Sequence, residues 1–296
     1  MEEIALTPAE FELFRVLIHQ KVGIVMSPAK MQLVHSRLGK RLRHHSLRSY
    51  QAYYDMLMAA GADSEEMVAF INCVTTNKTD FFREPHHFQF VTDTFLPELV
   101  QKVLRGSMPP KIRVWHAGCS TGEEPYSLAI TLQDALRGKN NWDVRQLASD
   151  IDTDVLAHAQ RGIYDLDRVK PVPDAQLKRY FLRGAGECKD TVKVATALSD
   201  QIAFRQINLL SEPWPIRADV RFDMIFCRNV VIYFDKPTQQ RLFARFTEYL
   251  RPGGYLFMGH SESLLGISNA YESLGSTIHR LPDCAFTDTA VGTRAA

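Results

Sequence analysis

The sequence of 296 residues lacks the features that mark several common protein classes. Its five cysteines are odd in number and widely spaced, with no CxxC pair, so neither a disulfide framework nor a zinc site is indicated. We therefore expect free thiols and no bound metal. No segment reaches 18 uninterrupted apolar residues, and the first residues, MEEIALTPAE, are acidic where a signal peptide is basic and then apolar. A cytoplasmic protein without membrane insertion is expected.

The chain also lacks an excess of charge of either sign. Its 35 basic and 34 acidic residues give a net charge of +1, which provides no global reason to expect nucleic acid. The segment from Lys30 to Arg48 differs, because it carries six basic residues, no acid, and apolar residues at helical spacing. It is predicted to form an amphipathic helix. Its basic face is either merely solvated or a docking surface for an acidic partner.

With 45% hydrophobic residues, the chain is long enough for one large or two ordinary domains. Residues 1–75 show helical patterns throughout. The first pattern has Thr7 as N-cap, Pro8 in the first turn and Glu10 at the capping-box position. These patterns predict an all-α N-terminal domain. Residues 76–111 are predicted to be a linker followed by one more helix, which two prolines terminate.

After residue 111, strand and helix patterns alternate. This alternation predicts a doubly wound α/β domain with a mostly parallel sheet over residues 112–284. Residues 183–207 interrupt the alternation with short β-prone runs, so a small antiparallel β insertion is expected there. The segment YESLGSTIHRL is expected to form a closing antiparallel hairpin, and residues 285–296 a disordered tail.

Polar side chains follow the predicted strands at their carboxyl ends, where open parallel sheets bind ligands. The first strand leads into GCSTGEEPYS with Glu123 and Glu124, the second ends at Asp150, and a later one ends in the CRN motif of residues 227–229. The two glutamates would repel a phosphate, and no GxGxxG motif is present. These features favour a ribose-bearing cofactor without phosphate, such as S-adenosylmethionine.

Five motifs stand in order along the chain: TTNKTDFFREPHHF, STGEEPYS, ASDID, FCRNVVIYF and LRPGGYLFMGHSE. Over residues 7–283 the chain resembles the chemotaxis receptor methyltransferases, the CheR family. The resemblance implies a Rossmann-like class I methyltransferase domain. It also implies transfer of a methyl group from S-adenosylmethionine to glutamate side chains of chemoreceptors, giving glutamate methyl esters. We expect the enzyme to act as a monomer.

The resemblance further assigns site residues by motif position. Cofactor contacts are implied for Asn77, Thr79, Arg83, Glu124, Asp150, Asn208, Leu209, Cys227, Arg228 and Asn229. Arg83 and Tyr233 are implied to be catalytic, with Tyr233 near the transferred methyl group. The basic segment would dock the glutamate-rich helices of a chemoreceptor's cytoplasmic domain, and the β insertion would capture a receptor C-terminal peptide by strand addition.

Several of these residues have structural alternatives. Asp150 could cap the following helix, although Asp152 could do so instead. Glu123 could serve only the dipole of the helix that begins there. Tyr233 could be a core residue with its hydroxyl satisfied elsewhere. His260, in the motif GHSE, is expected to be a loop residue, because no G-x-S-x-G nucleophile turn is present.

Two other functions stay open from the sequence. A nucleic-acid methyltransferase would fit the basic segment, but neither an Asn/Asp-Pro-Pro-aromatic loop nor a Pro-Cys nucleophile follows the strand that ends at residue 227. A non-catalytic, cofactor-sensing module that binds receptors is the second alternative. The presence of both Arg83 and Tyr233 argues against that module.

Overall fold

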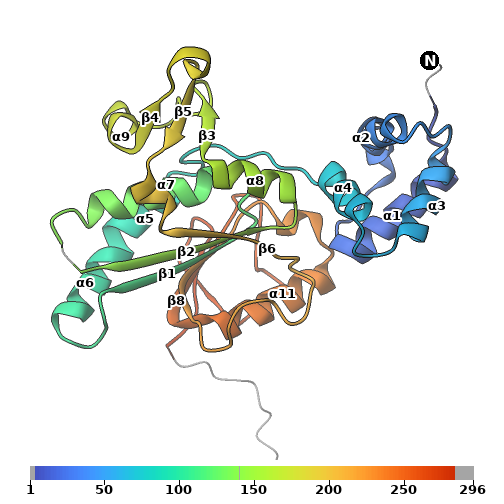
Figure 1. The fold of residues 1–296 in the computed structure, drawn as a ribbon. Helices are drawn as coiled ribbons and strands as arrows, with labels where there is room; N and C mark the ends of the chain where they lie inside the picture. Colours follow the sequence, from blue (N-terminus) through green and yellow to red (C-terminus); the bar gives the residue numbers. More distant parts are fainter. Residues whose placement is uncertain (1–3, 140, 284–296) are drawn as a thin grey trace, which may run out of the picture.

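A computed structural model describes residues 4–139 and 141–283 of the chain (Figure 1). The predicted tail at 285–296 lies outside the described residues. Within them, no helix is long and apolar enough to cross a membrane.

The N-terminal part is a bundle of helices that stands to one side of the main sheet (Figure 1). Its helices are α1 (Pro8–Val22), a short 3-10 turn (Pro28–Lys30), α2 (Met31–His44), α3 (Tyr50–Ala60) and α4 (Glu65–Val74). The predicted capping box at the start of α1 is confirmed, since Thr7 and Glu10 each accept from the other's backbone N–H. Apolar side chains such as Phe14 and Phe70 are fully buried between the helices.

A connecting segment leads from the bundle to a second helical stretch, which lies against the main sheet. This stretch consists of α5 (His86–Phe90), a π turn (Val91–Phe95) and α6 (Leu96–Leu104). Phe88, Val91 and Leu99 pack onto apolar residues of the sheet.

The main sheet has seven strands in the order β6-β2-β1-β7-β8-β10-β9. These strands are β1 (Lys111–Ala117), β2 (Asp143–Asp150), β6 (Ile202–Gln206), β7 (Phe222–Cys227), β8 (Leu250–Met258), β9 (Glu272–Ser273) and β10 (Ile278–Arg280). The first five are parallel, whereas β10 pairs antiparallel with β8 and β9. The predicted doubly wound α/β fold and closing hairpin are therefore confirmed. The strand order reverses between β1 and β7, which places the switch point there.

Helices cover both faces of this sheet. They are α7 (Glu123–Ala135), α8 (Thr153–Arg161) and α11 (Lys236–Tyr249), with a short 3-10 turn (Val231–Tyr233) before α11. Leu128 and Leu132 of α7 share an apolar cluster with α5 and α6, while Phe243 and Phe246 of α11 belong to another cluster. All six residues of β7 are buried, as expected for a central parallel strand.

A second, three-stranded antiparallel sheet projects from the main domain (Figure 1). Its order is β3-β5-β4, with β3 (Ile163–Asp165), α9 (Asp174–Tyr180), β4 (Phe181–Arg183), a 3-10 turn (Gly186–Cys188) and β5 (Thr191–Val194) in chain order. The short α10 (Thr196–Ser199) then leads back to the main sheet.

The small sheet confirms the predicted antiparallel insertion, but its predicted bounds of 183–207 are wrong. The sheet begins with Ile163, and residues 202–206 form β6, which pairs parallel with β2 in the main sheet. The reason lies in the position of β6 at the sheet edge. Most of its side chains are not buried, so its sequence lacks the apolar run of a central strand.

Candidate active site

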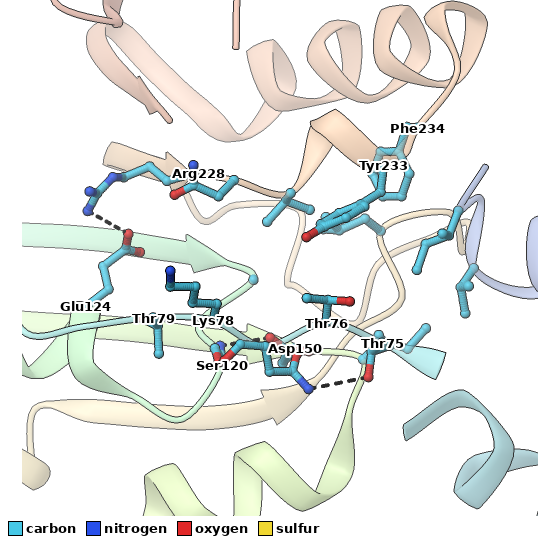
Figure 2. Close-up of a pocket in the computed structure, with 18 of the residues that line it drawn as sticks. Thr75, Thr76, Lys78, Thr79, Ser120, Glu124, Asp150, Arg228, Tyr233 and Phe234 are labelled. Carbon is cyan, nitrogen blue, oxygen red and sulfur yellow. Dashed lines mark hydrogen bonds and ion pairs between the residues drawn. The ribbon is translucent and has the colours of Figure 1, made fainter. Parts of the chain in front are cut away.

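One cavity lies at the carboxyl ends of β1, β2 and β7, beside the switch point of the main sheet. Its walls come from the loops after these strands, the connecting segment at residues 75–83, and the end of α1 (Figure 2). Val22 and Ile24 line it from the helical bundle. Both parts of the chain therefore build this cavity.

Asp150, at the end of β2, lies on the cavity floor. Its carboxylate accepts from the backbone N–H of Ser120 at 2.8 Å and from that of Asp152 at 3.1 Å. Burial raises the pKa of Asp150 to about 6, even though these two hydrogen bonds act in the opposite direction. Asp150 does not cap the next helix. Asp152 caps α8, since its Oδ1 accepts from the N–H groups of Asp154 and Val155.

Several amides of the Gly-rich turn after β1 already donate to protein acceptors. The amide of Ser120 already donates to Asp150, and Gly122, the N-cap of α7, has φ of 96°. The Tyr164 hydroxyl and the Ala159 Cβ approach Gly122 so closely that an added Cβ would lie 2.9 and 2.8 Å from them. Asp150 thus occupies the Ser120 amide and protein groups crowd Gly122, two positions at which such turns often contact a phosphate.

Glu123 and Glu124 have different surroundings. Glu124 lines the cavity, and its carboxylate accepts from His116 Nδ1 at 2.8 Å and from Arg228 Nη1 at 3.0 Å (Figure 2). Burial favours the neutral acid, but the hydrogen bond from His116 and the charge of Arg228 lower the pKa of Glu124 below its ordinary value. Glu123 is 1% exposed and pairs with Arg168 instead of facing the cavity.

Arg228 is buried and forms part of the cavity wall. Besides Glu124, its guanidinium lies 3.2 Å from Glu84 Oε2 and donates to the backbone carbonyl of Arg83. Its donors are directed at protein acceptors, so Arg228 joins the loop after β7 to α7 and to the connecting segment.

The connecting segment supplies the opposite wall. Asn77 donates through Nδ2 to Asp152 Oδ2 at 2.6 Å, and its carbonyl accepts from Ser120 Oγ at 3.0 Å. Thr79 and Arg83 line the cavity, and Arg83 Nη1 donates to the carbonyl of Lys78 at 3.0 Å. The buried ring of Phe81 anchors this extended stretch in the core below.

Asn208 and Leu209, which follow β6, also line the cavity. The Nδ2 group of Asn208 donates to the carbonyl of Lys21 at 2.8 Å, and its Oδ1 accepts from the N–H of Leu210 at 2.9 Å. In this structure the Asn208 side chain therefore ties the loop to the end of α1.

Cys227 is not among the residues that line the cavity, so its expected contact with the cofactor stays a prediction. Its side chain is 0% exposed and lies in an apolar cluster with Trp115 and Leu256. Successive side chains of a strand point to opposite faces, and the last residue of β7 points into the core. Burial raises the pKa of its thiol well above the ordinary value. Arg228 and Asn229, just beyond the strand, do reach the cavity.

Tyr233 stands at the other end of the same loop, with its hydroxyl directed into the cavity (Figure 2). Its backbone carbonyl accepts from the N–H of Val25 at 2.8 Å, and Lys30 Nζ lies 5.4 Å from its ring centroid. The ring thus packs against the bundle, as a core residue would, while the hydroxyl stays in the cavity. No partner for that hydroxyl is found within residues 4–139 and 141–283.

One cluster outside the cavity brings together possible metal ligands, namely Glu84, His86 and His87. Both histidines have Nε2 3.1 Å from the carbonyl of Ser276, while Glu84 pairs with Arg228 and His260. These groups serve a protein hydrogen-bond network, and His260 belongs to it as a loop residue, not to a catalytic triad.

The fold and the cavity together define a class of enzyme. A doubly wound sheet ending in an antiparallel hairpin, with an acid at the end of its second strand and no phosphate-binding turn, is a class I S-adenosylmethionine-dependent methyltransferase domain. Residues 77–280 match the family model of the CheR methyltransferase, SAM binding domain, and residues 9–75 match the CheR methyltransferase, all-alpha domain. The chain belongs to the CheR methyltransferase family, and S-adenosylmethionine is its cofactor.

Curated relatives agree over nearly the full length. The chain is 43% identical over 278 residues to chemotaxis protein methyltransferase 2 of Pseudomonas aeruginosa, which covers 94% of this chain and 95% of that protein. It is 42% identical over 281 residues to the chemotaxis protein methyltransferase of Escherichia coli, which covers 95% of this chain and 93% of the relative. The expected family and cofactor are confirmed.

Proposed function

We propose that this chain, acting in the cytoplasm, transfers a methyl group from S-adenosylmethionine to glutamate side chains on the cytoplasmic domains of chemoreceptors. The products are glutamate 5-O-methyl esters and S-adenosylhomocysteine. The observation that carries the proposal is the similarity to chemotaxis protein methyltransferases across both the helical bundle and the α/β domain.

The residues of the cavity fit the cofactor. The two carboxylates, Glu124 and Asp150, suit an ammonium group and ribose hydroxyls, and Asp150 occupies the Ser120 amide of the Gly-rich turn. We assign Asp150 to the ribose and Arg83, whose guanidinium suits a carboxylate, to the methionine carboxylate. Glu124 uses one acceptor site on each oxygen for His116 and Arg228. A carboxylate has about four such sites, so capacity for the amino group is left.

The reaction requires little proton transfer by the protein. When bound, the cofactor supplies an electrophilic methyl group on a sulfonium cation. The receptor glutamate is ionised at pH 7, because its reference pKa is about 4.3, so no general base is needed. The negative charge of the carboxylate and the positive charge of the sulfonium cancel as the methyl group moves. Water opposes the transfer, because it solvates the separated ions better than the neutral products. A closed cavity that holds both groups in line supplies most of the acceleration, and positioning alone can contribute roughly 7 to 11 kcal/mol.

Tyr233 is the residue we assign to the incoming glutamate. Its hydroxyl points into the cavity, where it can donate to the carboxylate and orient it. Arg228 is unsuited to this task because Glu84 and Glu124 hold its guanidinium. An arginine clamped on the attacking carboxylate would stabilise the ground state and slow the transfer.

The basic segment offers a smaller docking face than its composition suggests. Arg41 pairs with Glu66, and Arg37 donates to the carbonyls of Val74 and Thr75, so both arginines stabilise the bundle itself. Lys40, Arg43 and Arg48 are exposed. We assign docking of the acidic receptor helices to these three residues.

The small antiparallel sheet is the second contact we assign to receptors. Its central strand is β5, so β3 and β4 are edge strands with unpaired backbone groups. Leu182, on the edge strand β4, is 60% exposed. An extended C-terminal receptor peptide would add as a further strand and place its side chains against such residues.

The central experiment is incubation of the protein with methyl-labelled cofactor and receptor cytoplasmic fragments, with and without their C-terminal peptides. We expect label on glutamates that alkali releases, as an ester requires. Alkali-stable label, or label on added RNA, would replace the proposal with the nucleic-acid alternative. Cofactor binding without any transfer would favour the receptor-binding module.

The docking face is tested by the pair Lys40→Glu and Arg43→Glu. Methylation of receptor fragments should fall at least about tenfold at low salt, while cofactor affinity measured by calorimetry stays unchanged. Lys139, which is exposed and follows α7 of the α/β domain, serves as the control, and Lys139→Glu should leave both quantities unaltered. Unchanged methylation in the double variant would remove this face from the proposal.

A further inference from the structure

The loop from Arg228 to Tyr233 carries much of the cavity wall, yet its backbone has no regular secondary structure before the 3-10 turn. Asn229 adopts φ of 59°, in the left-handed region. Four successive N–H groups, from Asn229 to Ile232, point away from any strand ladder. Buried amides of this kind need acceptors, because an unpaired one costs about 1 to 3 kcal/mol.

One side chain supplies the acceptor for all four. The carboxylate of Glu262, in the loop after β8, accepts at Oε2 from Asn229 N at 2.9 Å. Its Oε1 accepts from Val230 N and Val231 N at 2.9 Å and from Ile232 N at 3.3 Å. It also accepts from the N–H of Gly259 at 2.6 Å. Five backbone amides thus surround one carboxylate in the manner of an anion-binding nest.

Glu262 has no remaining capacity for chemistry of its own. The residue is 6% exposed, and five donors fill the acceptor sites of a carboxylate, which number about four. It is not among the residues that line the cavity. Any influence on the reaction must therefore act through the loop that it holds.

The loop is also fixed by contact on two sides. On one side, a Cβ added at Gly118 would lie 2.4 Å from Val230 Cγ2. On the other, a Cβ added at Gly259 would lie 2.4 Å from Asn229 Nδ2 and 2.8 Å from the Asn229 backbone nitrogen. Two glycines therefore let the loop approach the neighbouring strands closely, and Glu262 holds its amides at that position.

We propose that Glu262 is a positioning residue for methyl transfer: its carboxylate fixes the loop Arg228–Tyr233 so that the cavity wall and the Tyr233 hydroxyl keep the geometry the reaction needs. Displacement of reacting groups by 1 Å can cost about a hundredfold in rate. The inference rests on the proposed function, since the reaction it concerns is the transfer to receptor glutamates.

The variants Glu262→Gln and Glu262→Asp test this role, with Glu272→Gln on the exposed strand β9 as the matched control. Glutamine keeps the size of the side chain but turns half of it into a donor, which faces amides that also donate. Aspartate keeps the charge but is one methylene shorter. We expect kcat to fall at least about tenfold in Glu262→Gln, to take an intermediate value in Glu262→Asp, and to be unchanged in the control.

Hydrogen exchange gives a readout that does not depend on the receptor. In Glu262→Gln the amides of residues 229–232 should lose protection while those of the bundle and of β1 keep it. A loss of kcat measured well below the melting temperature, together with this local loss, supports positioning. Normal kcat under those conditions, or an even loss of protection across the chain, would overturn the inference and leave only a stabilising role.

A second variant keeps the test valid if Glu262→Gln does not fold. Gly259→Ala leaves the carboxylate in place but pushes on Asn229. It should reproduce the fall in kcat and the local loss of protection, and a normal kcat would contradict the inference. If wild-type protein binds the cofactor but methylates no receptor, the proposed function fails. Amide hydrogen exchange at residues 229–232 still reports in that case whether Glu262 holds the loop.

Discussion

Asp150 and Asp152 stand two residues apart and have different tasks. Asp152 directs one oxygen to the start of α8 and the other to Thr75 and Asn77, so it joins the connecting segment to the sheet. Asp150 accepts only backbone hydrogen bonds and keeps part of its carboxylate toward the cavity. It is therefore the acid that can respond to a ligand.

Asp150 should make cofactor binding depend on pH. Its pKa is raised to about 6, so the protein without ligand is more stable with this acid neutral, and that stabilisation is lost as the pH rises through about 6. Asp150→Asn removes this titrating group, so the melting temperature of the variant relative to that of the wild type should be higher at pH 8 than at pH 5, whatever the loss of one acceptor for Ser120 or Asp152 costs at both pH values. The same variant should weaken cofactor binding about tenfold at pH 8, because the ribose hydroxyls donate best to an ionised carboxylate.

Calorimetry at pH 5 and pH 8 checks this prediction. Wild-type affinity should fall toward pH 5, and Asp150→Asn should flatten that dependence. Arg83→Ala should weaken binding equally at both pH values, and Asp174→Asn on the exposed start of α9 should have no effect. An unaltered pH dependence in Asp150→Asn would assign the titration to another group.

At this scale the sequence predicts strand ends better than side-chain directions. Glu124, Asp150 and Arg228 were predictable because polar residues at the carboxyl ends of parallel strands meet at one edge. The direction of the Cys227 side chain was not predictable, because a shift of one residue along a strand moves a side chain to the opposite face. The role of Glu262 was not predictable from a local pattern, since its partners lie some thirty positions earlier along the chain.

Among the elements, the small sheet contacts the cofactor region through Tyr164 of β3, which donates to the carbonyl of Thr121 at 2.6 Å, and through an arginine. Arg168, in the loop after β3, pairs with the buried Glu123 at the start of α7. Its Nη2 also donates to the carbonyl of Thr79 at 2.8 Å, and its Nη1 lies 3.4 Å from Asp80 Oδ1. The base of the small sheet therefore clamps the connecting segment onto α7, next to two residues that line the cavity.

Arg168→Ala should lower both stability and cofactor affinity. The variant leaves Glu123 buried without its cation. Breaking an ion pair costs about 3 kcal/mol of stability when both partners are buried. Because the Arg168 side chain is 42% exposed, a smaller loss of stability is expected here. Adding Glu123→Gln should restore part of the stability but not the affinity, because the bond to Thr79 stays broken. Urea unfolding and calorimetry measure the two quantities.

Arg217 provides the comparison, since its pair with Asp219 is largely exposed. Arg217→Ala should change the free energy of unfolding by less than about 1 kcal/mol. Equal effects of the two arginine variants, or full recovery of affinity in the double variant, would show that Arg168 does not connect the small sheet to the cavity.

The limits of the small sheet show why element boundaries were predicted less well than element types. The alternation of strands and helices was recognisable because the central strands are apolar and the helices begin with clear caps. β6 is short and mostly unburied, like a hairpin strand. Only its pairing with β2, which depends on the whole sheet, assigns it to the main domain.

In the whole molecule, the helical bundle forms part of the enzyme's cavity, in addition to the docking that we propose for it. The end of α1 contacts the loop before α11 through a bridge between Ile24 and Phe234, and the loop after β6 through Asn208. At another point of the same boundary, Asn72 of α4 donates to Thr153 at the start of α8 at 2.9 Å. No local pattern could predict that Val22 and Ile24 line the cavity, because this depends on how the two parts dock.

Gly23→Ala tests whether this boundary shapes the cavity. Gly23 ends α1 with φ of 71°, and an added Cβ would lie 2.9 Å from Leu210 Cδ1, next to the cavity residues Asn208 and Leu209. Gly106 after α6 has the same φ of 71° but nothing within 4 Å, so Gly106→Ala carries the same backbone strain, about 1 to 2 kcal/mol, without the contact.

Gly23→Ala should therefore lose at least as much stability as Gly106→Ala in urea unfolding. Only Gly23→Ala should also weaken cofactor binding, by about threefold to tenfold, which is roughly 1 kcal/mol. If the contact is relieved by movement of the segment that carries Leu210, the side chain of Asn208 is drawn away from Lys21. If the two variants bind the cofactor equally well, the bundle can shift at this boundary without cost to the cavity, and its role reduces to receptor docking.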